Sequence, residues 1–140
     1  ALTGPGVRNR IRSIDKDDRE AKTEYITMNG KDVFQFAVRK VPQVIQEVLK
    51  ENELSIEDID WFVLHQANAR ITATIAKRLK VPDEKIPMNV DKCGNTSAAS
   101  VAILLDEVNR KGMLKKGDKL MLAGFGSGLT WGTMAIEWGI

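Results

Sequence analysis

The sequence contains an uninterrupted apolar run, Trp61-Phe62-Val63-Leu64, followed at once by the polar stretch His65-Gln66-Ala67-Asn68. Apolar runs of this length are typical of strands buried on both faces of an α/β sheet. Asn68 is a good helix cap, and the aliphatic residues that follow it recur at helical spacing, which predicts a helix over 69–79. This strand and helix indicate an α/β fold.

Upstream, turn signals and apolar periodicity predict further elements. Residues 24–28 predict a short strand, Asn29-Gly30 predicts a turn, and the spacing from Asp32 onward predicts an amphipathic helix. Pro42 removes a backbone donor inside that helix, so we expect a kink or a break, with Pro42 near the start of a second helix. Ser55-Ile56-Glu57-Asp58 has the pattern of a capping box and predicts a single helical turn.

Downstream, we expect a loop between Pro82 and Pro87, a short strand at 88–90 and a helix that is capped within 95–97 and runs to about Arg110. After this helix, we expect a strand at 120–123, a Gly-rich turn at 124–128 and a strand at 130–138. The early helical residues 98–102 are small and mostly apolar, which predicts their burial. The last two strands predict a hairpin. The whole order predicts a mixed β-sheet packed with helices in an α-β-α arrangement.

Composition limits the class of protein. The 140 residues, 43% of them hydrophobic and with a formal charge of +2, fit one globular domain and give no sign of nucleic-acid binding. We find no apolar stretch long enough for a membrane span and no signal-peptide pattern at Ala1, so we expect a cytoplasmic protein. Cys93 and His65 are the single cysteine and histidine, which excludes an internal disulfide and a structural zinc site, and we expect no metal among the site residues.

Three polar or Gly-rich clusters follow the predicted apolar strands or open a helix: residues 65–68, 93–97 and 125–128. Ligand sites of α/β sheets lie at the carboxyl ends of strands, which favours one shared site. A structural histidine at 65 and plain helix caps at Asn68 and Asn95 are the alternative. Cys93 could pair with His65 as a nucleophile, although a lone cysteine is more often a small buried hydrophobe.

The Gly-rich segment at 124–128 does not fit the dinucleotide fingerprint, because its spacing differs and a strand follows it. Two interpretations stay open: a hairpin turn that needs positive φ, or a turn whose backbone N–H groups approach a substrate oxygen.

Three motifs together resemble the carboxyl-terminal half of β-ketoacyl-acyl carrier protein synthase III, in order and in spacing. They are His65-Gln66-Ala67-Asn68-x-Arg70-Ile71, Gly94-Asn95-Thr96-Ser97-Ala98-Ala99-Ser100 and Phe125-Gly126-x-Gly128-x-Thr130-Trp131-Gly132. The similarity runs from about Thr23 to the end. Residues 1–22 resemble the arm that connects the two halves, so we expect a connecting arm at 1–22 and a thiolase-like catalytic domain at 23–140. The start at Ala1 lacks a methionine and leads into a polar run, so we expect a cut edge or a processed fragment.

The resemblance implies an acyltransferase of the thiolase fold whose nucleophilic cysteine lies in the absent amino-terminal half. It would condense an acyl-coenzyme A primer with malonyl-acyl carrier protein, releasing carbon dioxide, to start type II fatty-acid synthesis. His65 and Asn95 match the family's catalytic positions, where two N–H donors would stabilise an enolate. Ser127 stands where the family has an oxyanion-hole glycine, and Phe125 would line the site. Cys93 is then not the nucleophile.

The resemblance also implies partners. Asn68 matches a substrate-binding residue near the pantetheine. Arg70, Lys77 and Arg78 match a basic surface for the acidic acyl carrier protein, and Gln35 replaces a lysine that many members carry there. Further expected partners are the amino-terminal half, coenzyme A thioesters and a second copy in a homodimer, with no nucleic acid, membrane or cofactor.

Two other functions remain open at this point. One is a related thiolase-fold condensing enzyme of secondary metabolism, with the same His65 and Asn95 acting on a different acyl chain. The other is a carrier-binding half-domain that is inert by itself, because its nucleophile is missing.

Overall fold

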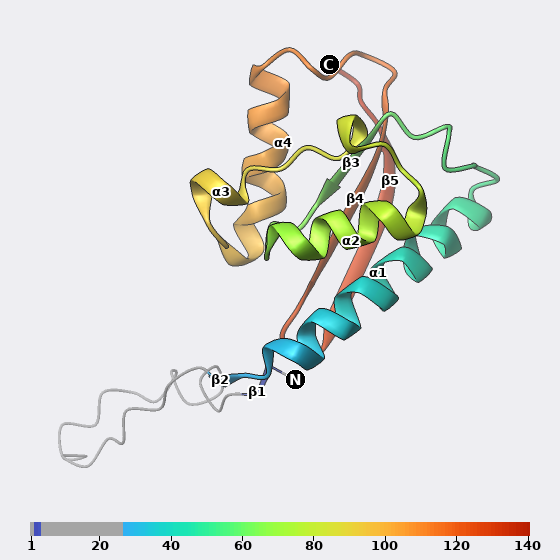
Figure 1. Ribbon diagram of the computed structural model, residues 1–140. Coiled ribbons are helices and arrows are strands. Elements are labelled where there is room, and N and C mark those ends of the chain that lie inside the picture. The colour runs from blue at the N-terminus through green and yellow to red at the C-terminus, as the bar shows by residue number, and fades with distance from the viewer. Residues whose placement is uncertain (1, 4–26) are drawn as a thin grey trace, which may run out of the picture.

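The computed structural model describes residues 2–3 and 27–140 (Figure 1). Strand β1 (Leu2–Thr3) pairs antiparallel with β2 (Thr27–Met28), which is the described end of the strand expected at 24–28. Apart from β1, the expected connecting arm at 1–22 lies outside the described residues.

The main sheet has three strands in the order β3 (Trp61–Leu64), β4 (Lys119–Gly126) and β5 (Thr130–Glu137). β3 runs parallel to β4, whereas β4 and β5 are antiparallel, so the predicted mixed sheet and hairpin are both confirmed. β4 extends three residues beyond the predicted strand, since its glycines continue the ladder with the start of β5.

Helices cover both faces of this sheet. α1 (Gly30–Glu51) and α2 (Ala69–Leu79) lie on one face and α4 (Ser100–Arg110) on the other (Figure 1). Alternation along β3 explains the layers: Phe62 and Leu64 join a core with α1 and α2, and Val63 joins a second core with α4. The expected three-layer arrangement is confirmed.

The expected break at Pro42 is wrong. α1 is a single helix through Pro42, which is itself buried. Around it, Val38, Val41 and Ile45 are almost completely buried in the core between α1, α2 and the sheet. Burial of this apolar stripe on both sides of the proline offsets the one backbone hydrogen bond that the proline removes.

The helical turn predicted at 55–58 is also wrong, because these residues form a turn without helix. The backbone N–H and the hydroxyl of Ser55 both donate to Asp58 Oδ2 at 2.7 Å. The serine hydroxyl thus acts as a donor to the carboxylate, and it is not used to cap backbone N–H groups of a helix.

Residues 88–90 are not a strand. The short helix α3 (Val90–Cys93) begins there, because the Asn89 carbonyl accepts from the N–H groups of Lys92 and Cys93 at 3.0 and 2.9 Å. The loop expected between Pro82 and Pro87 contains a 3₁₀ turn, η1 (Asp83–Lys85).

The helix expected from 95–97 starts later. A 3₁₀ turn, η2 (Ser97–Ala99), precedes α4. Ser100, Leu104 and Val108 form the buried stripe of α4, so the expected burial of residues 98–102 is confirmed for Ser100 and wrong for most of the others. Because the stripe at spacing four faces the sheet, Ala102 lies exposed on the opposite side of α4. Ala98 and Ala99, in η2, are exposed as well. Among the described helices, none is both long and apolar enough to cross a bilayer.

Candidate active site

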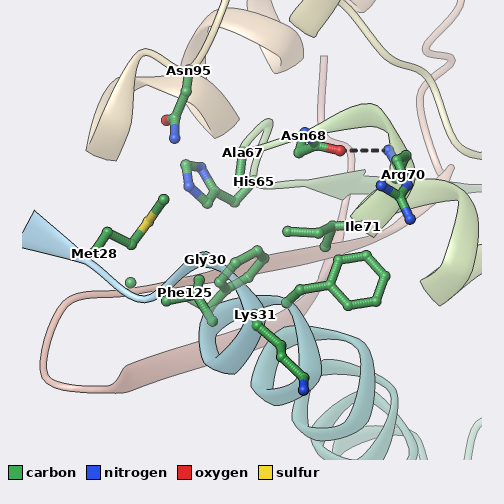
Figure 2. A pocket seen from close by; sticks show the side chains of 13 residues that line it. Met28, Gly30, Lys31, His65, Ala67, Asn68, Arg70, Ile71, Asn95 and Phe125 are labelled. Carbon is green, nitrogen blue, oxygen red and sulfur yellow. Dashed lines mark hydrogen bonds between the residues drawn. The ribbon is translucent and has the colours of Figure 1, made fainter. Parts of the chain in front are cut away.

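A cavity of about 510 Å³ lies beside the carboxyl ends of β3 and β4 (Figure 2). It brings together five of the residues predicted for the site, from three separate segments of the chain: His65, Asn68, Arg70, Asn95 and Phe125. The clusters at 65–68 and 125–128 meet there because β3 and β4 are parallel neighbours with Leu64 beside Ala123. The remaining lining residues are Met28, Gly30, Lys31, Val33, Phe34, Ala67, Ile71 and Gly126.

His65 is held from three sides. Its backbone N–H donates to the Ala123 carbonyl at 2.8 Å, which continues the β3–β4 ladder by one residue. Its Nδ1 forms a hydrogen bond with the hydroxyl of Ser100, the first residue of α4. The Phe125 ring meets the imidazole edge-on, with centroids 5.1 Å apart and planes at 74°. The imidazole therefore has one nitrogen engaged by protein and one left for the cavity.

Burial lowers the pKa of His65 below its ordinary value, since the cavity wall removes water that would stabilise the imidazolium. His65 is thus neutral at neutral pH and can donate a hydrogen bond from one ring nitrogen.

Asn95 reaches the cavity from the loop between α3 and η2. Gly94 before it has φ +67 and ψ −163, a conformation that glycine adopts far more easily than other residues. The Asn95 Oδ1 accepts the backbone N–H of Ser97 at 3.0 Å, which assigns the oxygen and leaves the amide N–H₂ group as the free donor. Figure 2 shows this side chain directed toward His65.

Asn68 and Arg70 lie on the side of the cavity formed by the start of α2. Asn68 is the N-cap of α2, with its Oδ1 accepting the Arg70 N–H at 2.8 Å (Figure 2). The Arg70 guanidinium lies 5.7 Å from the centroid of the Phe34 ring. The predicted cap is confirmed, and the same residue also lines the cavity, so the two interpretations of Asn68 are compatible.

Other predicted residues lie away from the cavity lining. Ser127 is exposed in the β4–β5 turn, where its carbonyl accepts from the Thr130 hydroxyl at 2.8 Å, and Gly126 lines the cavity in its place. Lys77 and Arg78 are exposed in the last turn of α2, beyond the cavity. Cys93 is exposed, so the expectation of a buried cysteine is wrong; it ends α3, which packs no side chain into the core.

A buried polar network supports the site. The Gln66 amide donates to the Leu64 carbonyl at 2.9 Å and accepts the Asn89 backbone N–H at 3.1 Å. The Asn89 side chain then donates to Glu107 on α4 at 2.8 Å. These bonds connect the end of β3 to the segment that leads to Asn95.

Sequence reasoning missed several lining residues. Phe34 carries only the general signal of an apolar helix position, Ile71 ends the first motif but has no predicted role, and Lys31 and Met28 carry no signal. Ser100 lies within a motif, yet a serine inside a helix gives no sign of its partner 35 residues away. Within residues 2–3 and 27–140, no group of three or more histidine, cysteine, aspartate or glutamate side chains is placed to hold a metal.

The arrangement fits the stabilisation of an oxyanion. His65 and Asn95 can each point an N–H donor into one partly apolar cavity, where such donors act more strongly than in water. Neither group needs to change its charge to do so.

Comparison with known proteins identifies a family. The family model described as 3-oxoacyl-[acyl-carrier-protein (ACP)] synthase III C terminal matches residues 49–138. The β-ketoacyl-[acyl-carrier-protein] synthase III of Synechocystis sp. is 48% identical over 126 residues, 90% of this chain and 38% of that protein. The synthase III structure from Thermus thermophilus aligns with a TM-score of 0.80 at 43% identity, covering 81% of this chain and 36% of that one.

A priming β-ketosynthase of the R1128 polyketide pathway also aligns, with a TM-score of 0.76, 37% identity and coverage of 83% of this chain and 35% of that one. These similarities confirm the expected thiolase-like α/β fold. The chain spans a little over a third of the length of the relatives named here.

Proposed function

This chain belongs to the family of 3-oxoacyl-[acyl-carrier-protein] synthase III C-terminal domains, and from that premise we propose that it supplies the decarboxylating part of such a synthase's active site. The whole enzyme would be an acyltransferase that condenses an acyl-coenzyme A primer with malonyl-acyl carrier protein. The observation that carries the proposal is that His65 and Asn95, from separate segments, line one cavity with their N–H donors available.

In the proposed reaction, the malonyl thioester oxygen lies between the two donors. The bond between the malonyl α-carbon and its carboxylate breaks, carbon dioxide leaves, and the electron pair forms an enolate. Hydrogen bonds from His65 and Asn95 stabilise the negative charge on the enolate oxygen. The enolate carbon then attacks the acyl thioester on a cysteine of the amino-terminal half, whose thiolate leaves. No cofactor takes part, since both thioesters are substrates.

The amino-terminal half is the first proposed partner. The exposed small residues Ala98 and Ala99 of η2 and Ala102 of α4, with Ile103 at 38% exposure, give the start of α4 and the turn before it a face that a second layer of structure can cover closely. The resemblance extends the proposal to a homodimer working in the cytoplasm.

Acyl carrier protein is the second proposed partner. Arg70, Lys77 and Arg78 are exposed on α2, and Arg70 also lines the cavity, so an acidic carrier bound there would deliver its thioester to His65. The backbone N–H of Ser127 is proposed to help form the oxyanion hole. Asn68 is proposed to bind substrate by contacting the pantetheine.

The test is a condensation assay with the chain joined to its amino-terminal half, using labelled acyl-coenzyme A and malonyl-acyl carrier protein. We expect His65→Ala and Asn95→Ala each to lower kcat by about 10²–10³-fold, the usual cost of one lost oxyanion donor. Arg70→Glu should instead raise KM for the malonyl carrier.

Cys93→Ala is the matched control, because Cys93 is two residues from Asn95, exposed and outside the cavity lining. It should keep full activity. If His65→Ala and Asn95→Ala were as active as Cys93→Ala, the proposal would be wrong. A panel of acyl-coenzyme A primers in the same assay distinguishes an initiating synthase from a condensing enzyme of secondary metabolism, which would prefer a different acyl chain.

A further inference from the structure

Ser100 is a buried hydroxyl with two polar neighbours. The residue is 1% exposed and occupies the first position of α4. Its Oγ is hydrogen-bonded to Nδ1 of His65, and the backbone N–H of Gln66 donates to the same oxygen at 3.3 Å. The hydroxyl therefore lies between the proposed catalytic imidazole and the backbone of the next residue.

The number of hydrogens and lone pairs on the Ser100 hydroxyl decides which group donates in its hydrogen bond with His65. A hydroxyl has one hydrogen and two lone pairs, and the Gln66 N–H occupies one lone pair because an amide N–H can only donate. If His65 also carried a hydrogen on Nδ1, both lone pairs would accept and the hydroxyl hydrogen would need a third partner. The described part of the chain offers this hydrogen no other acceptor, and a buried unpaired hydrogen is unfavourable.

The hydroxyl satisfies all three groups only when it donates to Nδ1. We infer that Ser100 is a positioning residue that holds neutral His65 with its hydrogen on Nε2, so that the imidazole donates a hydrogen bond into the cavity. This inference rests on the proposed function, in which that hydrogen bond stabilises the enolate.

The other contacts of His65 cannot make this selection. The Phe125 ring orients the imidazole by its edge but has no hydrogen-bonding atom. The His65 backbone N–H is bound to Ala123 and does not reach the ring. Ser100 is thus the group in the described structure that distinguishes the two ring nitrogens.

His65 is the single histidine of the chain, so ¹⁵N labelling of histidine gives one imidazole in the NMR spectrum of the 140-residue protein. At a pH where His65 is neutral, we expect Nε2 to show the shift of a protonated nitrogen and Nδ1 that of an unprotonated one. In Ser100→Ala, the ratio of the Nε2–H to the Nδ1–H form should fall roughly fivefold, the usual effect of one hydrogen bond.

Two further variants control for packing. Ser100→Thr keeps the hydroxyl and should keep the wild-type ratio. Ser97→Ala removes an exposed hydroxyl close by that makes no hydrogen bond in the described structure, and it should change nothing.

Protonation of Nδ1 in the wild type, or an unchanged ratio in Ser100→Ala, would overturn the inference. The wild-type spectrum is decisive by itself if Ser100→Ala does not fold. Because the spectrum needs no turnover, a negative result for Ser100 is distinguishable from a failure of the condensation assay.

Discussion

At the scale of single residues, His65 combines two effects that favour its neutral form. Burial lowers its pKa, and the Ser100 hydroxyl contacts a ring nitrogen that is unprotonated in the tautomer we infer. A neutral donor suits an enolate that forms and disappears, because no proton has to be transferred at this group.

The lowered pKa of His65 predicts how stability depends on pH. The unfolded chain takes up a proton near the ordinary pKa of about 6.5, while the folded chain does so only at lower pH. The contribution of neutral His65 to the free energy of unfolding is therefore complete above pH 6.5. It is lost as the pH falls from the His65 pKa of the unfolded chain to the lower pKa of the folded chain. Wild-type protein should lose more Tm between pH 7.5 and 5.5 than His65→Gln does.

This comparison isolates one group, since all carboxylates are common to both proteins and the chain has no other histidine. Equal losses of Tm in the two proteins would mean that burial does not disfavour the imidazolium.

At the scale of elements, the segment from α3 to α4 positions Asn95. Gln66 and Asn89 hold its start, and Ser100 holds its end against His65. Between them, Gly94 turns the backbone at φ +67. The donor at 95 is therefore placed by backbone geometry as much as by side-chain contacts.

Gly94→Ala should reduce the free energy of unfolding by about 1–3 kcal/mol, because its backbone conformation is strained for any residue with a Cβ. The space itself is open, since a Cβ at Gly94 would have no atom within 4 Å. Urea denaturation measures the change, and kcat of the joined enzyme should fall as well because Asn95 shifts.

Gly124→Ala is the matched control. A Cβ there also has open space, but Gly124 lies in β4 without a positive φ. It should change stability by no more than about 0.5 kcal/mol. A similar loss in both variants would argue against backbone conformation as the cause.

At the scale of the whole molecule, the sheet is covered on both faces, yet α4 has an exposed side. Ile103 lies there with the alanines at 98, 99 and 102. An apolar face of this kind is typical of a surface that another structure covers.

Ile103→Lys should weaken association with a separately produced amino-terminal half at least tenfold, about 1.4 kcal/mol, because it brings a charge into an apolar contact. The stability of the chain itself should change little, since Ile103 is outside the core. Isothermal titration calorimetry measures the affinity. Asn109→Lys, exposed at the other end of α4, should bind like the wild type; equal weakening by both would contradict this placement.

Local sequence determined much of the fold. The strand at 61–64, the Asn68 cap, the helix at 69–79 and the hairpin were all predicted, because each depends on neighbouring residues and on apolar periodicity. Predictions failed where distant groups compete with local preference. Pro42 stays helical because of core burial, and residues 88–89 lead into the helix that starts at Val90 while Asn89 binds Gln66.

The candidate site was also predicted in part from local sequence and in part decided by contacts between distant segments. The motifs around His65, Asn95 and Phe125 identified a family and a shared site from sequence, and all three residues line the cavity. Only the tertiary structure decided that Ser100 bonds to His65 and that Gly126 lines the cavity while Ser127 does not. The physical reason is that residue types and short spacings are written in the chain, whereas hydrogen bonds between segments depend on how the sheet and its helices pack.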